Sequence, residues 1–178
     1  MGQRLADIER QRRLVAAPGV IRGVALVLPP GIAGPRKEDK DPDTFAISTE
    51  ESERRGVDLT MAAERALGRA PEEMPHNNKG FDIRSTDANG DVYFIEVKAR
   101  TRGADLFTVT ASEIQFAQNQ SEDNRHILSL VSLSPDGPAH DDIRYVYRAF
   151  DGIRPGLGTG TVNEKWAYHW NRGIDPRA

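Results

Sequence analysis

Residues 81–98 read FDIRSTDANGDVYFIEVK, and this stretch decides the fold of the chain. Two strand-like runs, 81–85 and 92–98, flank a turn-forming segment at 87–91. Such a pattern predicts a β-hairpin. Because successive side chains of a strand point to opposite faces of the sheet, Glu96 and Lys98 must lie on the same face.

The register of this hairpin depends on its turn. A two-residue turn at Asn89 and Gly90 pairs Asp82 with Val97, whereas a three-residue loop with a left-handed Gly90 pairs Asp82 with Glu96. We expect the second register because it separates polar from apolar side chains. Its polar face carries Asp82, Arg84, Phe94, Glu96 and Lys98, and its apolar face carries Phe81, Ile83, Tyr93, Ile95 and Val97.

The predicted pairing of Asp82 with Glu96 points to a cation. Two carboxylates on neighbouring strands repel each other and bring no structural benefit. A hard divalent cation reverses that repulsion, and magnesium commonly uses one or two carboxylates together with water and phosphate oxygens. Lys98, on the same face, would then orient a water or stabilise charge on a phosphoryl group. A solvated strand face with a simple Glu–Lys pair fits the spacing equally well.

Further elements are predicted on both sides of the hairpin. Upstream, an amphipathic helix is indicated by helical spacing of Leu59, Ala62, Ala63, Ala66 and Leu67. Downstream, we expect strands at 106–109, 127–133 and 143–150, with Thr110 or Ser112 capping a helix after the first of them. The run 127–133 is nearly all apolar, which favours a central strand. The fold class is therefore α/β, with a mixed sheet flanked by helices.

The two ends of the chain differ from this central part. Residues 1–30 predict a charged helix and a strand and are interpreted as a connector, and 31–47 are too rich in charge, proline and glycine to bury a face. Residues 151–178 are expected to form a C-terminal extension. There, Trp166, Tyr168 and Trp170 alternate with other residues, which predicts a strand that packs as an aromatic flap.

Composition limits the protein class. The 178 residues are 38% hydrophobic, and no run approaches the roughly 20 apolar residues of a spanning helix, so we expect no membrane partner. The chain has no cysteine, which excludes disulfides and thiolate metal sites and favours a cytoplasmic location. A formal net charge of −3 argues against coating nucleic acid through bulk charge. The four histidines show no metal-ligand spacing.

The motifs around the hairpin resemble those of a known family. The stretch GFDI at 80–83, followed by IEVK at 95–98, looks like the Asp…(Asp/Glu)-x-Lys signature of the restriction-endonuclease-like nucleases. ERALGRAP at 64–71 precedes it, VTASE at 109–113 follows it, and IRYVYRAF at 143–150 closes the series. This ordered series is similar to the domain at the C-terminus of the plant protein NO VEIN.

The resemblance implies a restriction-endonuclease-like core over 48–150 and a set of site residues. Asp82 and Glu96 would hold magnesium, or manganese in its place, and Lys98 would be the catalytic lysine. Glu64, on the first helix, matches an acidic residue that approaches the metal or its water, whereas Glu113 matches a glutamate without an assigned role. The side chains expected to meet DNA are Arg84, Arg100, Arg102 and Gln115.

The resemblance also implies a biological setting. Such domains lie at the end of Swi/Snf-type helicases and defence-associated ATPases, so we expect a helicase or ATPase partner in cis or in trans, and the chain itself is interpreted as a fragment of a longer protein. Nucleases of this fold often act as homodimers. The expected function is a metal-dependent nuclease acting on DNA. The alternatives are a catalytically inactive domain that binds nucleic acid or docks onto its motor, and a protein-interaction domain.

Overall fold

The structure, a computed structural model, describes residues 48–120, 124–154 and 160–178. The chain divides into two compact units, Met1–Thr44 and Phe45–Ala178, and all described residues belong to the second. The helix and strand expected within 1–30 and the linker expected at 31–47 therefore lie outside the described residues.

The described elements include both helices and strands, as the fold class requires. In chain order they are α2 (Thr49–Ala66), β1 (Ala70–Glu73), β2 (Ile83–Thr86), β3 (Val92–Thr101), β4 (Leu106–Thr110), α3 (Ala111–Asn119), β5 (His126–Leu133), a 3₁₀ turn (Pro138–His140), β6 (Asp142–Tyr147), β7 (Thr161–Lys165) and α4 (Trp166–Arg172). None of the described helices is long and apolar enough to cross a membrane.

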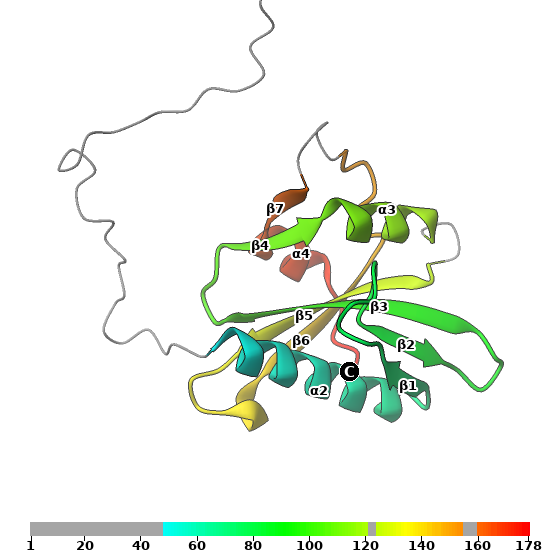
Figure 1. Cartoon of the computed structure of the whole chain (residues 1–178). Coiled ribbons are helices and arrows are strands. Elements are labelled where there is room, and N and C mark those ends of the chain that lie inside the picture. The colour runs from blue at the N-terminus through cyan, green and yellow to red at the C-terminus, as the bar shows by residue number, and fades with distance from the viewer. Residues whose placement is uncertain (1–47, 121–123, 155–159) are drawn as a thin grey trace, which may run out of the picture. The chain divides into compact units, whose positions relative to one another are not determined.

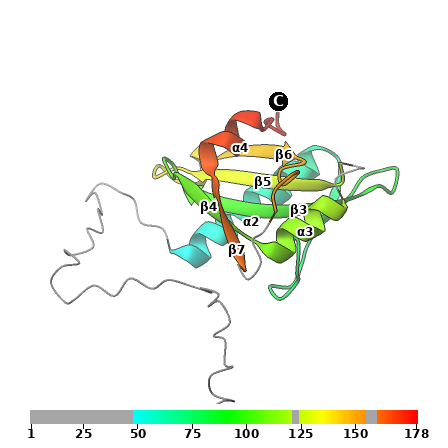
Figure 2. The same cartoon turned by 90° about the horizontal axis from the view of Figure 1, so that it is seen from above.

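The main sheet has five strands in the order β1-β2-β3-β5-β6. Only β3 and β5 run parallel, and the other neighbours are antiparallel. Helix α2 covers one face of this sheet, while α3 and a separate β4–β7 pair lie over the other, as Figures 1 and 2 show from two directions. The expected class, a mixed α/β sheet flanked by helices, is confirmed.

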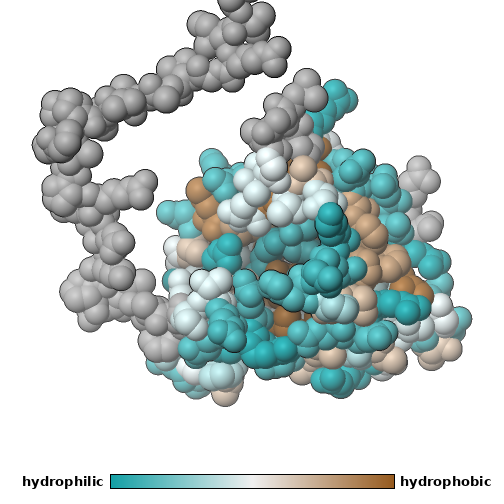
Figure 3. All heavy atoms as spheres, in the orientation of Figure 1, coloured by the Kyte–Doolittle hydropathy of each residue, from teal (hydrophilic) through white to brown (hydrophobic). Residues whose placement is uncertain are grey.

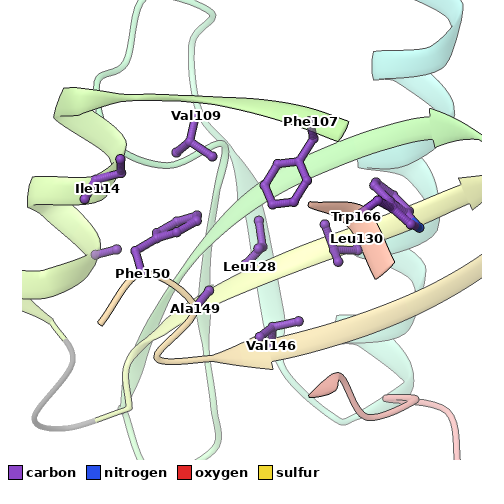
Figure 4. Close-up of a cluster of buried hydrophobic side chains, with 10 residues drawn as sticks. Phe107, Val109, Ile114, Leu128, Leu130, Val146, Ala149, Phe150 and Trp166 are labelled. Carbon is purple, nitrogen blue, oxygen red and sulfur yellow. The ribbon is translucent and has the colours of Figure 1, made fainter. Parts of the chain in front are cut away.

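Two apolar clusters hold these layers together. Strand β5 contributes to both, and all of its residues are buried, as expected for a central strand. The cluster beneath α2 contains Ala63, Ile83, Ile95, Ala99, Ile127, Val131, Leu133, Ile143 and Tyr145. The opposite cluster, drawn in Figure 4, contains Phe107, Val109, Ile114, Ala117, Leu128, Leu130, Val146, Ala149, Phe150 and Trp166.

Side-chain caps begin both long helices. Ser48 accepts a hydrogen bond from the backbone N–H of Glu51 at the start of α2. At the start of α3, the Thr110 hydroxyl accepts from the N–H of Glu113, whose carboxylate accepts from the N–H of Thr110. This reciprocal capping box satisfies two otherwise unpaired backbone donors. It confirms Thr110, one of the two candidates, as the cap.

The hairpin has the register that brings Asp82 opposite Glu96. Ile83 pairs with Ile95, and Gly90 has a φ of 87°, the left-handed conformation that the three-residue loop requires. The prediction that Phe81 lies on the apolar face of the hairpin was wrong. Because this residue precedes β2 and follows the left-handed Gly80, strand alternation does not extend to it. Its ring packs 4.9 Å from Phe94 and 5.0 Å from Phe116, on the α3 side.

The C-terminal residues differ from their expected form. Trp166, Tyr168 and Trp170 lie on helix α4 and not on a strand. Trp166 is buried and Trp170 packs on the same cluster, whereas Tyr168 is 57% exposed, so only two of the three rings pack as expected. Strand β7 precedes this helix and pairs with β4, which joins residues far apart in the sequence.

Candidate active site

Asp82 lies at the entrance to β2, directly across from Glu96 on β3. Its backbone N–H donates to the carbonyl of Ile95 at 2.8 Å, so it holds to the same β3 residue that pairs with Ile83, where the regular ladder ends. Its side-chain Oδ2 accepts a hydrogen bond from the N–H of Val97 at 2.8 Å. The backbone of β3 therefore holds this carboxylate beside Glu96.

Three side chains form an ion network next to Asp82. Nζ of Lys98 lies 2.5 Å from Oε1 of Glu96 and 3.0 Å from Oε2 of Glu113. Glu96 is only 3% exposed, and Lys98 and Glu113 are largely buried. Glu96 and Lys98 come from β3 and Glu113 from the first turn of α3, so the network spans the gap between the sheet and this helix.

These groups line a pocket of about 520 Å³. Its walls come from the first half of α2, the loop before β2, strands β3 and β4, and the start of α3. Six carboxylates line it, against two arginines and one lysine. The carboxylates are Glu50, Glu53, Glu73, Asp82, Glu96 and Glu113, and the fixed cations are Arg54, Lys98 and Arg100. Figure 3 shows that hydrophilic residues cover much of the surface over α2.

Burial and mutual repulsion perturb the acidity of the site. Burial, reinforced by Asp82 and Glu113, raises the pKa of Glu96 to about 8, although Lys98 opposes this. Burial also raises the pKa of Asp82, more than the hydrogen bond from Val97 lowers it. For Lys98, burial lowers the pKa, but attraction to Glu96 and Glu113 outweighs burial and leaves it raised. Negative charge here exceeds what one ammonium compensates.

Glu64 is not part of this site, which corrects the expectation drawn from its position on the first helix. It is fully buried and does not line the pocket. The face of α2 on which it lies packs on the opposite side of the sheet from Glu96. There its carboxylate pairs with Arg69 at 3.3 Å, and next to burial it is the group that most raises the pKa of Tyr145.

The four residues expected to contact DNA lie at different places in the structure. Arg100 lines the pocket. Arg84 is exposed on β2 and Gln115 is exposed on α3, but neither lines the pocket. Arg102 lies beyond the pocket as well and pairs with Asp142 of β6 at 3.3 Å. Of the four, only Arg100 adjoins the acidic side chains.

Sequence reasoning missed the two acidic residues, Glu50 and Glu53, that α2 does bring to the site. Glu53, near the start of the helix, lines the pocket and contributes to the raised pKa of Asp82. It lies about three helical turns before Glu64, and only the contact of α2 with the sheet shows which end of the helix meets the pocket. Glu113 had no expected role, although the Thr-x-x-Glu spacing that caps α3 was visible in the sequence.

The donor set fits a cation that takes few protein ligands. No three His, Asp or Glu side chains within the described ranges are arranged to hold a metal ion together. Asp82 and Glu96 nevertheless offer two hard carboxylate oxygens in a site with excess negative charge. This number and type of ligand matches magnesium, which completes its shell with water and phosphate oxygens.

Comparisons with known proteins identify a family and several similar solved structures. The family model described as Protein NO VEIN, C-terminal, matches residues 52–146. The structure of Hjc from Archaeoglobus fulgidus, described as a Holliday junction resolvase from an archaeal hyperthermophile, is similar, with 14% sequence identity and a TM-score of 0.43. The similarity covers 68% of this chain and 96% of that one. No curated protein matches the chain in sequence.

Proposed function

This chain belongs to the family described as Protein NO VEIN, C-terminal, and for this member we propose a metal-dependent nuclease activity that hydrolyses DNA phosphodiester bonds. The observation that carries the proposal is the placement of Asp82 opposite Glu96, with Lys98 beside them, at one pocket. The spacing of an Asp…Glu-x-Lys series could not by itself guarantee that the three groups meet.

The charge of the pocket favours a nuclease over a domain that only binds DNA. A surface that binds phosphates presents Lys and Arg side chains to them. This pocket instead has twice as many carboxylates as fixed cations, so without an added cation it repels a phosphodiester. A divalent cation on Asp82 and Glu96 offsets most of that repulsion, so metal binding should favour substrate binding.

Each group of the site has a defined part in the proposed chemistry. Asp82 and Glu96 would hold magnesium or manganese. When bound, such an ion acts as a Lewis acid toward phosphoryl oxygens and water. Lys98 lines the same pocket, and its ammonium would orient the attacking water and stabilise the negative charge that develops on the phosphate. Arg100 is placed to contact the phosphate backbone next to the site.

The proposal includes delivery of this domain to DNA by a helicase or ATPase module, in cis or in trans. The net charge of −3 and the few exposed arginines near the pocket support only weak DNA binding by the domain alone. A tether to a motor raises the local concentration of DNA and offsets that weakness. Arg84, Arg102 and Gln115 remain proposals for DNA contact outside the pocket, as does a homodimer with one site per strand.

The test is cleavage of plasmid and single-stranded DNA by the full chain in magnesium, manganese or chelator. We expect metal-dependent cleavage that falls at least roughly 100-fold in Asp82→Asn and Lys98→Met, because each change removes a charged group from the reacting centre. Glu72→Gln and Lys165→Met also replace a carboxylate by its amide and a lysine by methionine, but at exposed positions outside the pocket, and they should cleave like wild type.

Two results would contradict the proposal. Cleavage that survives chelator or both site substitutions would show that the pocket does not catalyse it. DNA binding without cleavage, unaffected by metal, would identify the domain as a nucleic-acid-binding module instead.

A further inference from the structure

Glu113 makes two sets of contacts with one carboxylate. Its Oε2 accepts a hydrogen bond from the backbone N–H of Thr110 at 3.0 Å and one from Nζ of Lys98, also at 3.0 Å. Its own N–H donates to the Thr110 hydroxyl at 3.2 Å. The oxygen that closes the capping box of α3 is therefore the oxygen that binds the lysine of the proposed site.

The cap restricts where this carboxylate can lie. A glutamate on a helix surface samples several side-chain conformations, but the hydrogen bond from Thr110 fixes the conformation of Glu113. Lys98 has a long, flexible side chain, and its second partner, Glu96, lies only 2.5 Å away. Without Glu113, the Lys98 ammonium would form an ion pair with Glu96 alone. It would then neutralise the charge of Glu96, which is a proposed metal ligand.

We infer that Glu113 is a positioning residue that holds the Lys98 ammonium between the start of α3 and Glu96. This inference rests on the proposed nuclease function for its catalytic consequence. The contact itself does not depend on that function. Glu113 does not need to touch substrate, because it acts through Lys98.

Two substitutions separate positioning from helix capping. Thr110→Val removes the capping hydroxyl but keeps the backbone N–H that binds Glu113, so the Lys98 contact remains. Glu113→Leu keeps its own N–H bond to the Thr110 hydroxyl, but it removes the carboxylate that accepts from the Thr110 N–H and from Lys98. Each should lower the Tm by about 3–6 °C, since each weakens the same cap. Only Glu113→Leu should disturb Lys98.

The first readout is the ammonium signal of Lys98 in nitrogen-15 NMR of the full chain, assigned by its loss in Lys98→Met. In Glu113→Leu, exchange of the ammonium protons with water should become at least roughly tenfold faster, because a charged hydrogen-bond acceptor is lost. The exchange should stay unchanged in Thr110→Val. The signal of the exposed Lys165 is the internal reference in every sample.

The second readout is the rate of DNA cleavage. Glu113→Leu should lower kcat roughly 10- to 100-fold with KM within about twofold, since it misplaces a reacting group without removing a substrate contact. Glu113→Gln should recover part of that loss, because a neutral amide oxygen can still accept both hydrogen bonds. Thr110→Val should keep the wild-type kcat.

The inference is overturned if Lys98 exchange is the same in Glu113→Leu as in wild type, or if Thr110→Val and Glu113→Leu alter it equally. A wild-type chain that cleaves no DNA would remove the proposed nuclease function but not this test. In that case the ammonium exchange alone decides whether Glu113 holds Lys98.

Discussion

Glu64 and Glu96 are both almost fully buried, yet their partners give them different roles. Glu64 forms an ion pair with Arg69, and the guanidinium of Arg69 lies 3.8 Å above the ring of Tyr93. Its charge is therefore matched by one cation in a packed setting. Glu96 shares the Lys98 ammonium with Glu113 and lies opposite Asp82, so its charge is only partly matched. Excess negative charge at a pocket suits cation binding, whereas a matched pair stabilises the fold.

Substitution of Glu64 should therefore affect stability and not catalysis. Glu64→Gln keeps the shape of the side chain but removes the charge that pairs with Arg69, so the free energy of unfolding should fall by about 1–3 kcal/mol. The folded fraction should cleave DNA at the wild-type rate. Urea unfolding and cleavage below the melting transition measure the two effects. The control is Glu72→Gln at an exposed position. A large loss of kcat in Glu64→Gln would contradict this prediction and indicate that Glu64 takes part in catalysis.

Helix α2 and strand β3 are in close contact. A Cβ added to Gly56 of α2 would lie 2.7 Å from the Cβ of Ala99, so the helix backbone rests directly on the strand that carries Glu96 and Lys98. Arg55 fixes the same helix to the connection after β5 through a buried pair with Asp141 at 2.6 Å. These two contacts fix the distance of α2 from the sheet and its orientation. They therefore also fix the position of the end of α2 that lines the pocket.

A larger residue at Gly56 should push α2 off the sheet. Gly56→Leu is expected to lower the free energy of unfolding by about 1–3 kcal/mol, because the rigid Ala99 Cβ cannot move aside. Chemical denaturation measures this change. Gly160→Leu is the matched control, since a Cβ added at Gly160 meets nothing within 4 Å. Equal stability of Gly56→Leu and wild type would show that the helix and strand are not in such close contact.

At the scale of the whole molecule, two buried groups make stability depend on pH in opposite directions. Burial lowers the pKa of His126 from 6.5 to about 4, and its Nε2 has no hydrogen-bond partner within the described part of the chain. The unfolded chain then binds a proton that the folded one does not, so stability falls as pH drops from about 6.5 to 4. Glu96, whose pKa is raised by burial to about 8, favours the folded state at low pH, and this contribution is lost as pH rises from 4.5 to 8.

Single substitutions should remove these two effects separately. In His126→Leu, the loss of stability between pH 6.5 and 4 should shrink by up to about 3 kcal/mol, the value of the pKa difference. In Glu96→Gln, measured in metal-free buffer, the loss of stability between pH 4.5 and 8 should become smaller instead. Urea unfolding at a series of pH values measures both. His140→Gln, at an exposed position, should leave the profile unchanged, and a profile unaltered by His126→Leu would show that this histidine is not buried in its neutral form.

The local features of this protein could be predicted from its amino-acid sequence. The hairpin register followed from the Gly90 turn and the alternation of residues around it, and the position before a helical run narrowed the cap of α3 to Thr110 or Ser112. Both depend on backbone preferences and contacts between residues close together in the chain, which a sequence pattern records directly. The placement of Asp82 opposite Glu96 belongs to this class.

The faces and ends at which the elements meet could not be predicted from the sequence and became apparent in the three-dimensional structure. Helical spacing locates the stripe of α2 but not the sheet face that it covers, so it could not show that Glu53 lines the pocket and Glu64 does not. The spacing of Trp166, Tyr168 and Trp170 suits a strand, but Trp166 and Trp170 are also one helical turn apart, and packing selected the helix. Both outcomes depend on the burial of apolar side chains between segments that are distant in the sequence. A local residue pattern does not show which distant segments will pack together.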